Sequence, residues 1–156
     1  MLKTEKRLID NQILFEAILD TLSQGHQASF TVTGMSMWPF LCHGRDQVIL
    51  ETADNSALKK GDVVLLQTPL ENYILHRITS LTDTAFETTG DGNCFRDGTF
   101  PISCMKAKAV RFIRNGKEIN CSSMRWKAIF HIWMMLFPVR RYLFAIWKKI
   151  RPFFRK

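Results

Sequence analysis

The sequence predicts a mainly β fold, a small coiled sheet or barrel with one helix before it and a helical tail after it. Three observations support this class. The middle of the chain contains short strand-like runs separated by turn residues. Residues 5–24 carry apolar side chains at helical spacing. After residue 120 the composition becomes aromatic and basic. A chain of 156 residues is long enough for one domain with a buried core.

The first predicted element is an amphipathic helix at residues 5–24. Gly25 follows the last apolar position and is expected to end the helix. The first residues contain no long apolar core, so the sequence predicts neither a signal peptide nor a membrane span there. We assign residues 1–27 to this N-terminal helical segment.

Residues 28–120 are expected to form the β body. The turns between its strands are rich in Gly, Asp and Asn, which tolerate the backbone conformations that tight turns require. Strands are predicted at residues 28–33, 47–51, 63–67, 73–79, 85–89, 106–113 and 117–119.

Residues 121–156 form the third predicted segment, a basic, aromatic-rich tail. The formal net charge of the chain is +8, and the tail holds nine Lys and Arg but no Asp or Glu. Residues 1–120 therefore carry 13 basic and 14 acidic side chains, a net charge of −1. Trp and Tyr beside Lys and Arg are typical of a helix lying in an anionic membrane interface. The apolar run 128–139 is too short to span a bilayer alone, and Arg140 and Arg141 follow it.

We therefore predict that the tail associates with an anionic membrane surface, and the basic flanks favour the cytoplasmic face. Two other interpretations stay open. The tail can form a helical hairpin packed on the β body, or it can bind a nucleic acid, a partner that we do not expect.

The cysteines suggest free thiols in a reducing compartment. The four residues are Cys42, Cys94, Cys104 and Cys121. None forms a Cys-x-x-Cys pair, and no Cys/His cluster has the spacing of a zinc site. Two disulfides are the alternative. No metal or cofactor is predicted.

Three residues have the chemistry of a catalytic group. Ser36 lies on a turn after a strand, which is how a nucleophile is presented and also how ordinary loops look. His76 alternates with Ile74 and Ile78 on one face of its strand, so it is either a core histidine or a partly buried general base. Asp91 lies between two glycines, where an Asp is often only a turn residue. In a triad it would orient the histidine.

Four short segments, taken in order, resemble the type I signal peptidases. Gly34–Pro39 has the Gly-x-Ser-Met-x-Pro pattern of the nucleophile box. Lys59–Val64 follows, then His76–Ile78 as the base box and Gly90–Asn93 as a Gly-Asp-x-Asn box. The resemblance covers about residues 28–119. Bacterial members and the related repressor-type self-cleaving proteases use a lysine as the base, whereas endoplasmic-reticulum and archaeal members have a histidine.

The resemblance implies a serine endopeptidase in which Ser36 is the nucleophile, His76 the general base and Asp91 the supporting acid. The backbone N–H of Ser36 would contribute to the oxyanion hole. The resemblance also makes Gly34, Met35, Met37 and Pro39, which flank Ser36 in the nucleophile box, the candidate oxyanion or substrate-binding residues. Gly34 stands where some members carry a hydroxyl donor.

The implied substrate is a leader, signal-like peptide or preprotein with small residues before the cleaved bond. One departure from the family concerns the N-terminus, because members usually begin with a membrane anchor and this sequence has an amphipathic helix. Two alternatives remain: a non-catalytic peptide- or membrane-binding module on the same fold, and a self-cleaving regulator of the repressor type.

Overall fold

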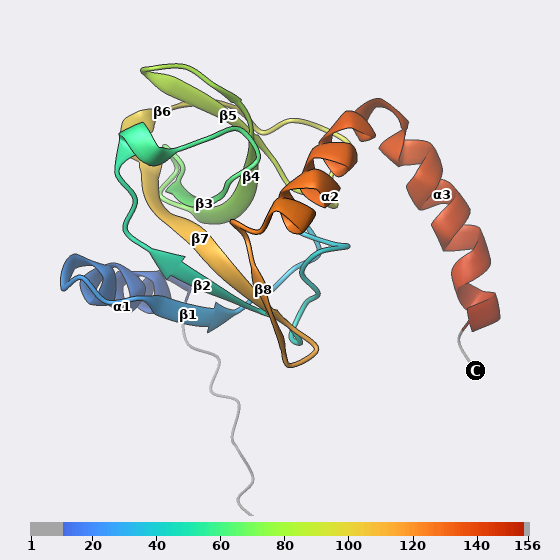
Figure 1. Cartoon of the computed structure of the whole chain (residues 1–156), viewed down its shortest axis with the longest axis horizontal. Helices are drawn as coiled ribbons and strands as arrows, with labels where there is room; N and C mark the ends of the chain where they lie inside the picture. Colours follow the sequence, from blue (N-terminus) through green and yellow to red (C-terminus); the bar gives the residue numbers. More distant parts are fainter. Residues whose placement is uncertain (1–10, 155–156) are drawn as a thin grey trace, which may run out of the picture.

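The computed structural model describes residues 11–154 and has a mixed α/β architecture (Figure 1). An eight-stranded antiparallel sheet lies between an N-terminal helix and a bent pair of C-terminal helices. The strands are β1 (Ala28–Thr31), β2 (Gln47–Glu51), β3 (Val63–Gln67), β4 (Tyr73–Leu81), β5 (Ala85–Thr89), β6 (Gly98–Pro101), β7 (Met105–Arg114) and β8 (Lys117–Asn120). The α-helices are α1 (Asn11–Ser23), α2 (Met124–Met135) and α3 (Arg140–Ile150). Short 3₁₀ segments are Asn55–Ala57, Ile102–Cys104, Phe137–Val139 and Arg151–Phe154.

The sheet is open. Its strands run in the order β1-β2-β7-β3-β4-β5-β6, and β8 adds to β7 in a hairpin. The end strands β1 and β6 pair only with β2 and β5, respectively. The expected β body is confirmed, but closure into a barrel is wrong, because these two short end strands do not pair with each other.

Two apolar clusters pack on opposite faces of the curved sheet, and β3 contributes to both. Val63–Leu66 is buried along its whole length. Alternate side chains point to opposite faces of a strand, so Val63 and Leu65 join the larger cluster and Val64 and Leu66 the smaller one. The larger cluster also holds buried residues of α1 and α2, including Ile18 and Phe130. Segments from both ends of the chain therefore share a core with the β body.

Helix α1 agrees with the predicted N-terminal helix over its described part; residues 5–10 of that prediction lie outside the described residues. The N–H of Gly25 bonds to the carbonyl of Leu22, and Gly25 has φ of +79°. That left-handed conformation favours glycine and ends the helix where we expected it. Phe15 projects from α1 onto the sheet, where its ring stacks on Tyr73 at 4.8 Å between centroids.

Strand β6 has no counterpart among the predicted strands. It consists of four residues, begins with Gly98 and ends with Pro101, and both residue types are depleted in strands. Only Phe100 is buried in it. An edge strand tolerates Pro because one side makes no ladder hydrogen bonds. The local sequence therefore carries little strand signal, and pairing with β5 produces the strand.

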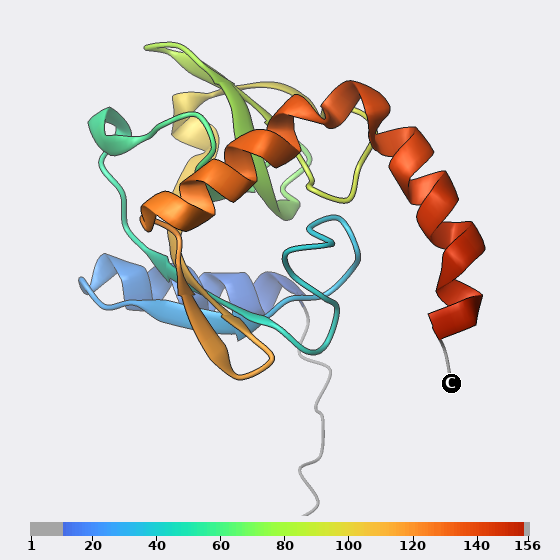
Figure 2. The ribbon, with the colours of Figure 1, turned by 45° about the vertical axis from the view of Figure 1, so that its right-hand side comes forward.

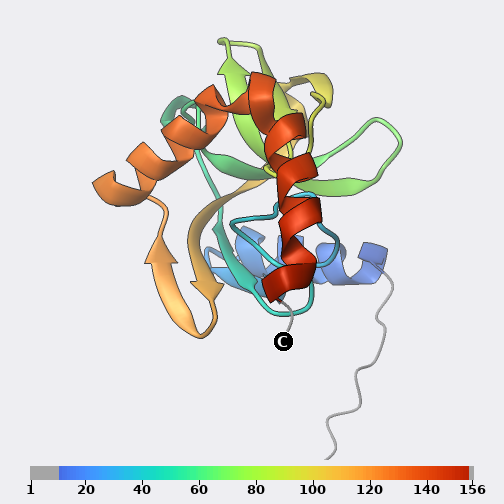
Figure 3. The same cartoon turned by 90° about the vertical axis from the view of Figure 1, so that its right-hand side faces the viewer.

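The two tail helices differ in how they contact the body. Phe130 of α2 is buried in the larger cluster, so α2 packs on the β body. The alternative of a packed helical hairpin agrees with the structure for α2 alone, because α3 leaves α2 at a bend of 52°. Helix α3 extends away from α2 beside the loop that contains Ser36 (Figures 2 and 3). Its buried residue is Arg140. Exposed apolar side chains on α3 are Tyr142, Leu143, Ile146, Trp147 and Ile150.

Within residues 11–154, no single helix has both the length and the apolar character to cross a membrane. The stretches Met124–Met135 and Phe137–Ile150, which meet at a bend of 52°, satisfy those criteria only when they are taken together.

Candidate active site

Ser36 lies on the turn that follows β1. Gly34 enters this turn with φ of +81°, a conformation that favours glycine, and its N–H donates to Nδ1 of His43 at 2.9 Å. The peptide bond between Trp38 and Pro39 is cis. Ser36 is half-buried, and in the described part of the chain no acceptor bonds its backbone N–H. That N–H is free to bind an oxyanion, and the side chain is accessible from a pocket.

The Gly90–Asn93 box packs directly against the serine turn. The N–H of Gly92 donates to the carbonyl of Ser36 at 2.7 Å. A Cβ on Gly92 would lie 2.4 Å from the carbonyl oxygen of Met35, and one on Gly90 would lie 2.5 Å from that of Ser36. Both contacts are shorter than real Cβ atoms make. Glycine is therefore required at both positions, because the backbone of the box supports the backbone of the turn.

His76 on β4 is held by a carboxylate that the sequence analysis did not select. Its Nδ1 lies 2.5 Å from Oδ2 of Asp97, which immediately precedes β6. Asp97 also accepts a hydrogen bond from Oγ1 of Thr88 at 2.8 Å. An ionised carboxylate only accepts hydrogen bonds, so Nδ1 of His76 carries the proton and Nε2 is left as the basic nitrogen.

Ser36 and His76 line the same pocket, which has a volume of about 210 Å³. Its walls come mainly from α1, β1, the serine turn and β4, and include the aromatic residues Phe15, Phe30 and Tyr73. Thr33 also lines the pocket. No hydrogen bond joins Ser36 to His76 among the described side chains. Such bonds are often long in ligand-free sites and tighten when substrate binds.

Asp91 does not support His76, contrary to our prediction. Its carboxylate instead forms a two-point ion pair with Arg77, at 2.8 Å to Nε and 2.6 Å to Nη2. Both side chains are 1% exposed. Arg77 follows His76 on β4, so its side chain points to the opposite face, where its guanidinium lies 4.1 Å from the ring centroid of Phe130. Arg77 thus points away from His76, and Asp91 pairs with Arg77.

The other residues of the predicted nucleophile box are spread around the turn. Met37 is buried and lines the pocket with Ser36. Met35 is exposed, and Pro39 is half-buried. Neither Met35, Pro39 nor Gly34 is among the residues that line the pocket.

The C-terminal helices are attached to the same box. Nε1 of Trp133 donates to the carbonyl of Asp91 at 3.0 Å. Buried Arg140 donates to the carbonyls of Gly90 and Asn93, both at 3.4 Å, and to that of Trp133 at 3.0 Å. Burial lowers the pKa of Arg140, and the charge of Asp91 opposes that shift. The tail thereby stabilises the loop that supports Ser36.

The four cysteines are free thiols. Burial raises the pKa of Cys121 to about 12, although the charge of Arg77 opposes this. Among residues 11–154, no group of three or more His, Cys, Asp or Glu side chains is arranged to hold a metal ion.

Comparison with known proteins identifies no relative. No family model matches the chain, and neither the curated proteins nor the solved structures contain a match. The function must therefore be argued from the site.

Proposed function

We propose that this protein is a serine endopeptidase of the signal peptidase type that cleaves a leader or signal-like peptide. The observation that carries the proposal is the pocket shared by Ser36 and His76, in which Asp97 holds Nδ1 of the histidine. Nucleophile, base and orienting acid are the three parts of a serine peptidase site. The order of the four sequence boxes supports the same class.

The proposed mechanism uses Ser36 and His76, which line one pocket, and Asp97, which contacts Nδ1 of His76. Oγ of Ser36 attacks the peptide carbonyl while Nε2 of His76 takes its proton, and Asp97 stabilises the imidazolium. The backbone N–H of Ser36 binds the oxyanion of the tetrahedral intermediate. The C–N bond then breaks as His76 returns the proton to the leaving amine. Water, deprotonated by His76, releases the acyl group from Ser36.

The substrate is proposed to bind as an extended segment beside the serine turn. Strand β1 is an end strand that leads into this turn, so its free edge can pair with a peptide. The pocket beside Ser36 is walled by Phe15, Phe30 and Tyr73, and therefore suits a small or medium apolar side chain.

The test is labelling by a fluorophosphonate together with cleavage of a peptide that has small residues before the scissile bond. Ser36→Ala should abolish both. Ser80→Ala is the matched control, because Ser80 is an exposed serine of β4 outside the pocket. Equal labelling and cleavage by wild type and Ser36→Ala would refute the peptidase.

A stable fragment released from the chain itself, absent in Ser36→Ala, would favour the self-cleaving regulator. Peptide binding without cleavage would favour the binding module.

We further propose that α3 holds the enzyme at an anionic membrane surface, with the active site on the cytoplasmic face. One side of the helix exposes Leu143, Ile146 and Ile150, whereas Arg141 and Lys148 lie on another. This amphipathic pattern without acidic residues is that of an interfacial helix.

Vesicle flotation tests the membrane contact. Ile146→Glu should reduce binding to phosphatidylglycerol vesicles far more than Ala145→Glu does. Both variants change the net charge equally, but only the first removes a large exposed apolar side chain. Equal flotation of the two variants would contradict an interfacial apolar face.

A further inference from the structure

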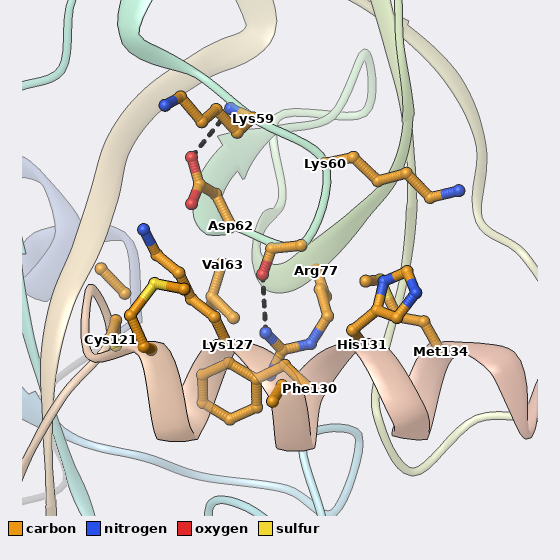
Figure 4. A pocket seen from close by; sticks show the side chains of 14 residues that line it. Lys59, Lys60, Asp62, Val63, Arg77, Cys121, Lys127, Phe130, His131 and Met134 are labelled. Carbon is orange, nitrogen blue, oxygen red and sulfur yellow. Dashed lines mark hydrogen bonds between the residues drawn. The ribbon is translucent and has the colours of Figure 1, made fainter.

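A second cavity lies on the far side of β4 from Ser36, between α2 and strands β3 and β7 (Figure 4). Its volume is about 390 Å³, within the range of small-molecule sites. The interior is mainly apolar, and shares no residue with the Ser36 pocket. Its walls include Val63, Ala109, Ala128, Phe130 and Met134.

This apolar cavity continues into a more polar one of about 460 Å³ that lies against β7. Lys59, Asp62, Ala109, Cys121 and Lys127 line both cavities. Together they form one groove, which we call the α2 groove, with an apolar end under the helix and a polar end open to solvent. Such a division matches a ligand that has an apolar chain and a polar head.

The charges of the α2 groove favour an anionic head. Lys59, Lys60 and Lys127 line it, and none of the three makes an ion pair within the described part of the chain. Asp62 is already neutralised, because Nζ of Lys108 lies 2.8 Å from its carboxylate. The backbone N–H of Lys59 also donates to that carboxylate. Glu51 also lines the polar end and makes no ion pair in the described part of the chain, so the three lysines leave the groove with a net positive charge. Lys59 and Lys127 lie where its two ends meet.

The floor of the groove connects to the active-site scaffold. Phe130 and Arg77 both line it, and Figure 4 shows the Arg77 guanidinium above α2 beside the Phe130 ring. Arg77 also binds the carbonyl of Gly61 and the carboxylate of Asp91. A ligand in the apolar end would contact the residues that hold the Gly90–Asn93 box.

We propose that the α2 groove binds a single-chain anionic amphiphile, such as an acyl chain that bears a carboxylate or phosphate. The chain lies in the apolar end between α2 and β3, and the head binds Lys59 and Lys127. The site is separate from the peptidase pocket, so this proposal does not depend on peptidase activity.

Binding is tested on the full chain with laurate below its micellar concentration, by calorimetry and by NMR of ¹³C-methyl methionines. Laurate should shift the methyl resonances of Met124 and Met134, which line the apolar end, and leave that of Met35 at the serine turn unchanged. Dodecyltrimethylammonium, of equal chain length and opposite charge, should bind at least about tenfold more weakly. Equal affinities, or a shift at Met35 without one at Met134, would overturn the proposal.

Two pairs of variants test separately the contacts of the ligand's charged head group and those of its alkyl chain. Lys59→Gln with Lys127→Gln should weaken laurate about tenfold and leave dodecanol unaffected, whereas Lys148→Gln with Lys149→Gln on α3 should change neither. Ala128→Phe should fill the cavity and weaken both ligands, whereas Ala145→Phe on α3 should not. If each groove variant behaves like its α3 control, the groove is not the site.

A parallel measurement with vesicles distinguishes the binding of a monomeric ligand in the groove from contact of the protein with a membrane. Phosphatidylglycerol vesicles contact the tail under the membrane proposal above, so their effect is measured separately from that of laurate. A Met134 response that requires vesicles and is absent with monomeric laurate would contradict a groove ligand and assign the response to membrane contact.

Discussion

His76 and Arg77 lie on opposite faces of β4 and have different roles, although each is paired with an aspartate. Each residue binds an aspartate from the segment between β5 and β6. On the His76 face, the pair with Asp97 borders the pocket of Ser36, and both side chains keep 9% exposure. On the Arg77 face, the pair with Asp91 is 1% exposed.

The difference shows that strand alternation, rather than motif membership, decides which aspartate can reach His76. Adjacent residues of a strand point to opposite faces. An acid that reaches the Arg77 face therefore cannot orient the imidazole of His76, however well its sequence box fits. Asp91 belongs to the scaffold, and Asp97 belongs to the site.

The largest expected effect is on stability, from breaking the Arg77 pair. Asp91→Ala leaves a buried guanidinium unpaired, so the free energy of unfolding should fall by about 3–5 kcal/mol. Urea unfolding followed by circular dichroism measures it. Arg96→Ala is the matched control, because it breaks the exposed pair with Glu87 and should cost about 0–1 kcal/mol. Similar losses of unfolding free energy in both variants would show that the buried Arg77–Asp91 pair stabilises the fold no more than the surface Arg96–Glu87 pair does.

The next effect is on catalysis, from the His76 face. Asp97→Asn should lower kcat/KM for the peptide substrate about 100- to 1,000-fold, because an amide can hold the wrong tautomer of His76. Unfolding free energy should change far less than in Asp91→Ala. Asp83→Asn, in an exposed turn, is the control. Full activity of Asp97→Asn would exclude Asp97 from the catalytic site.

A smaller effect tests the contact between the box and the serine turn. Gly92→Ala should cost about 1–3 kcal/mol of stability, because its Cβ meets the rigid carbonyl of Met35. It should also lower kcat/KM by displacing Ser36. Gly25→Ala has a strained φ but open space around its Cβ, so it should leave kcat/KM unchanged. A Gly92→Ala enzyme with normal kcat/KM would show that the box does not position Ser36.

The smallest effect concerns Cys121 near the Arg77 face. Its pKa is raised to about 12, so at pH 8 the thiolate, which is the reactive form, is scarce. Iodoacetamide should therefore modify Cys121 at least about tenfold more slowly than exposed Cys94. Mass spectrometry of the alkylated peptides gives both rates. Equal rates would mean that this side of the molecule is open to solvent and reagent.

Several elements could be predicted because their signal is local. Strands β2, β3 and β5 begin and end at the predicted residues, since apolar or β-branched runs are bounded there by turn residues. The end of α1 followed from Gly25, whose φ is positive. The positions of Ser36 on a turn and His76 on a strand were also predictable.

Other features have no local signal. Strand β6 exists because β5 offers an edge, and without β6 in the prediction nothing indicated that Asp97 would approach His76. Arg140 follows the apolar run 128–139 and is nevertheless buried, where its Nη1 and Nη2 donate to the carbonyls of Gly90, Asn93 and Trp133. Its Nε has no hydrogen-bond partner in the described part of the chain. These contacts join residues far apart in the chain.

The sequence by itself determined the β body, the ending of α1, the turn that carries Ser36 and the strand that carries His76, because spacing and turn chemistry act over a few residues. Only the tertiary structure decided that the sheet stays open, that α2 packs on the core, that Gly92 supports the serine turn, and that Asp97 rather than Asp91 reaches His76. Those outcomes depend on which strands pair and which face a side chain enters, and both are properties of the folded sheet.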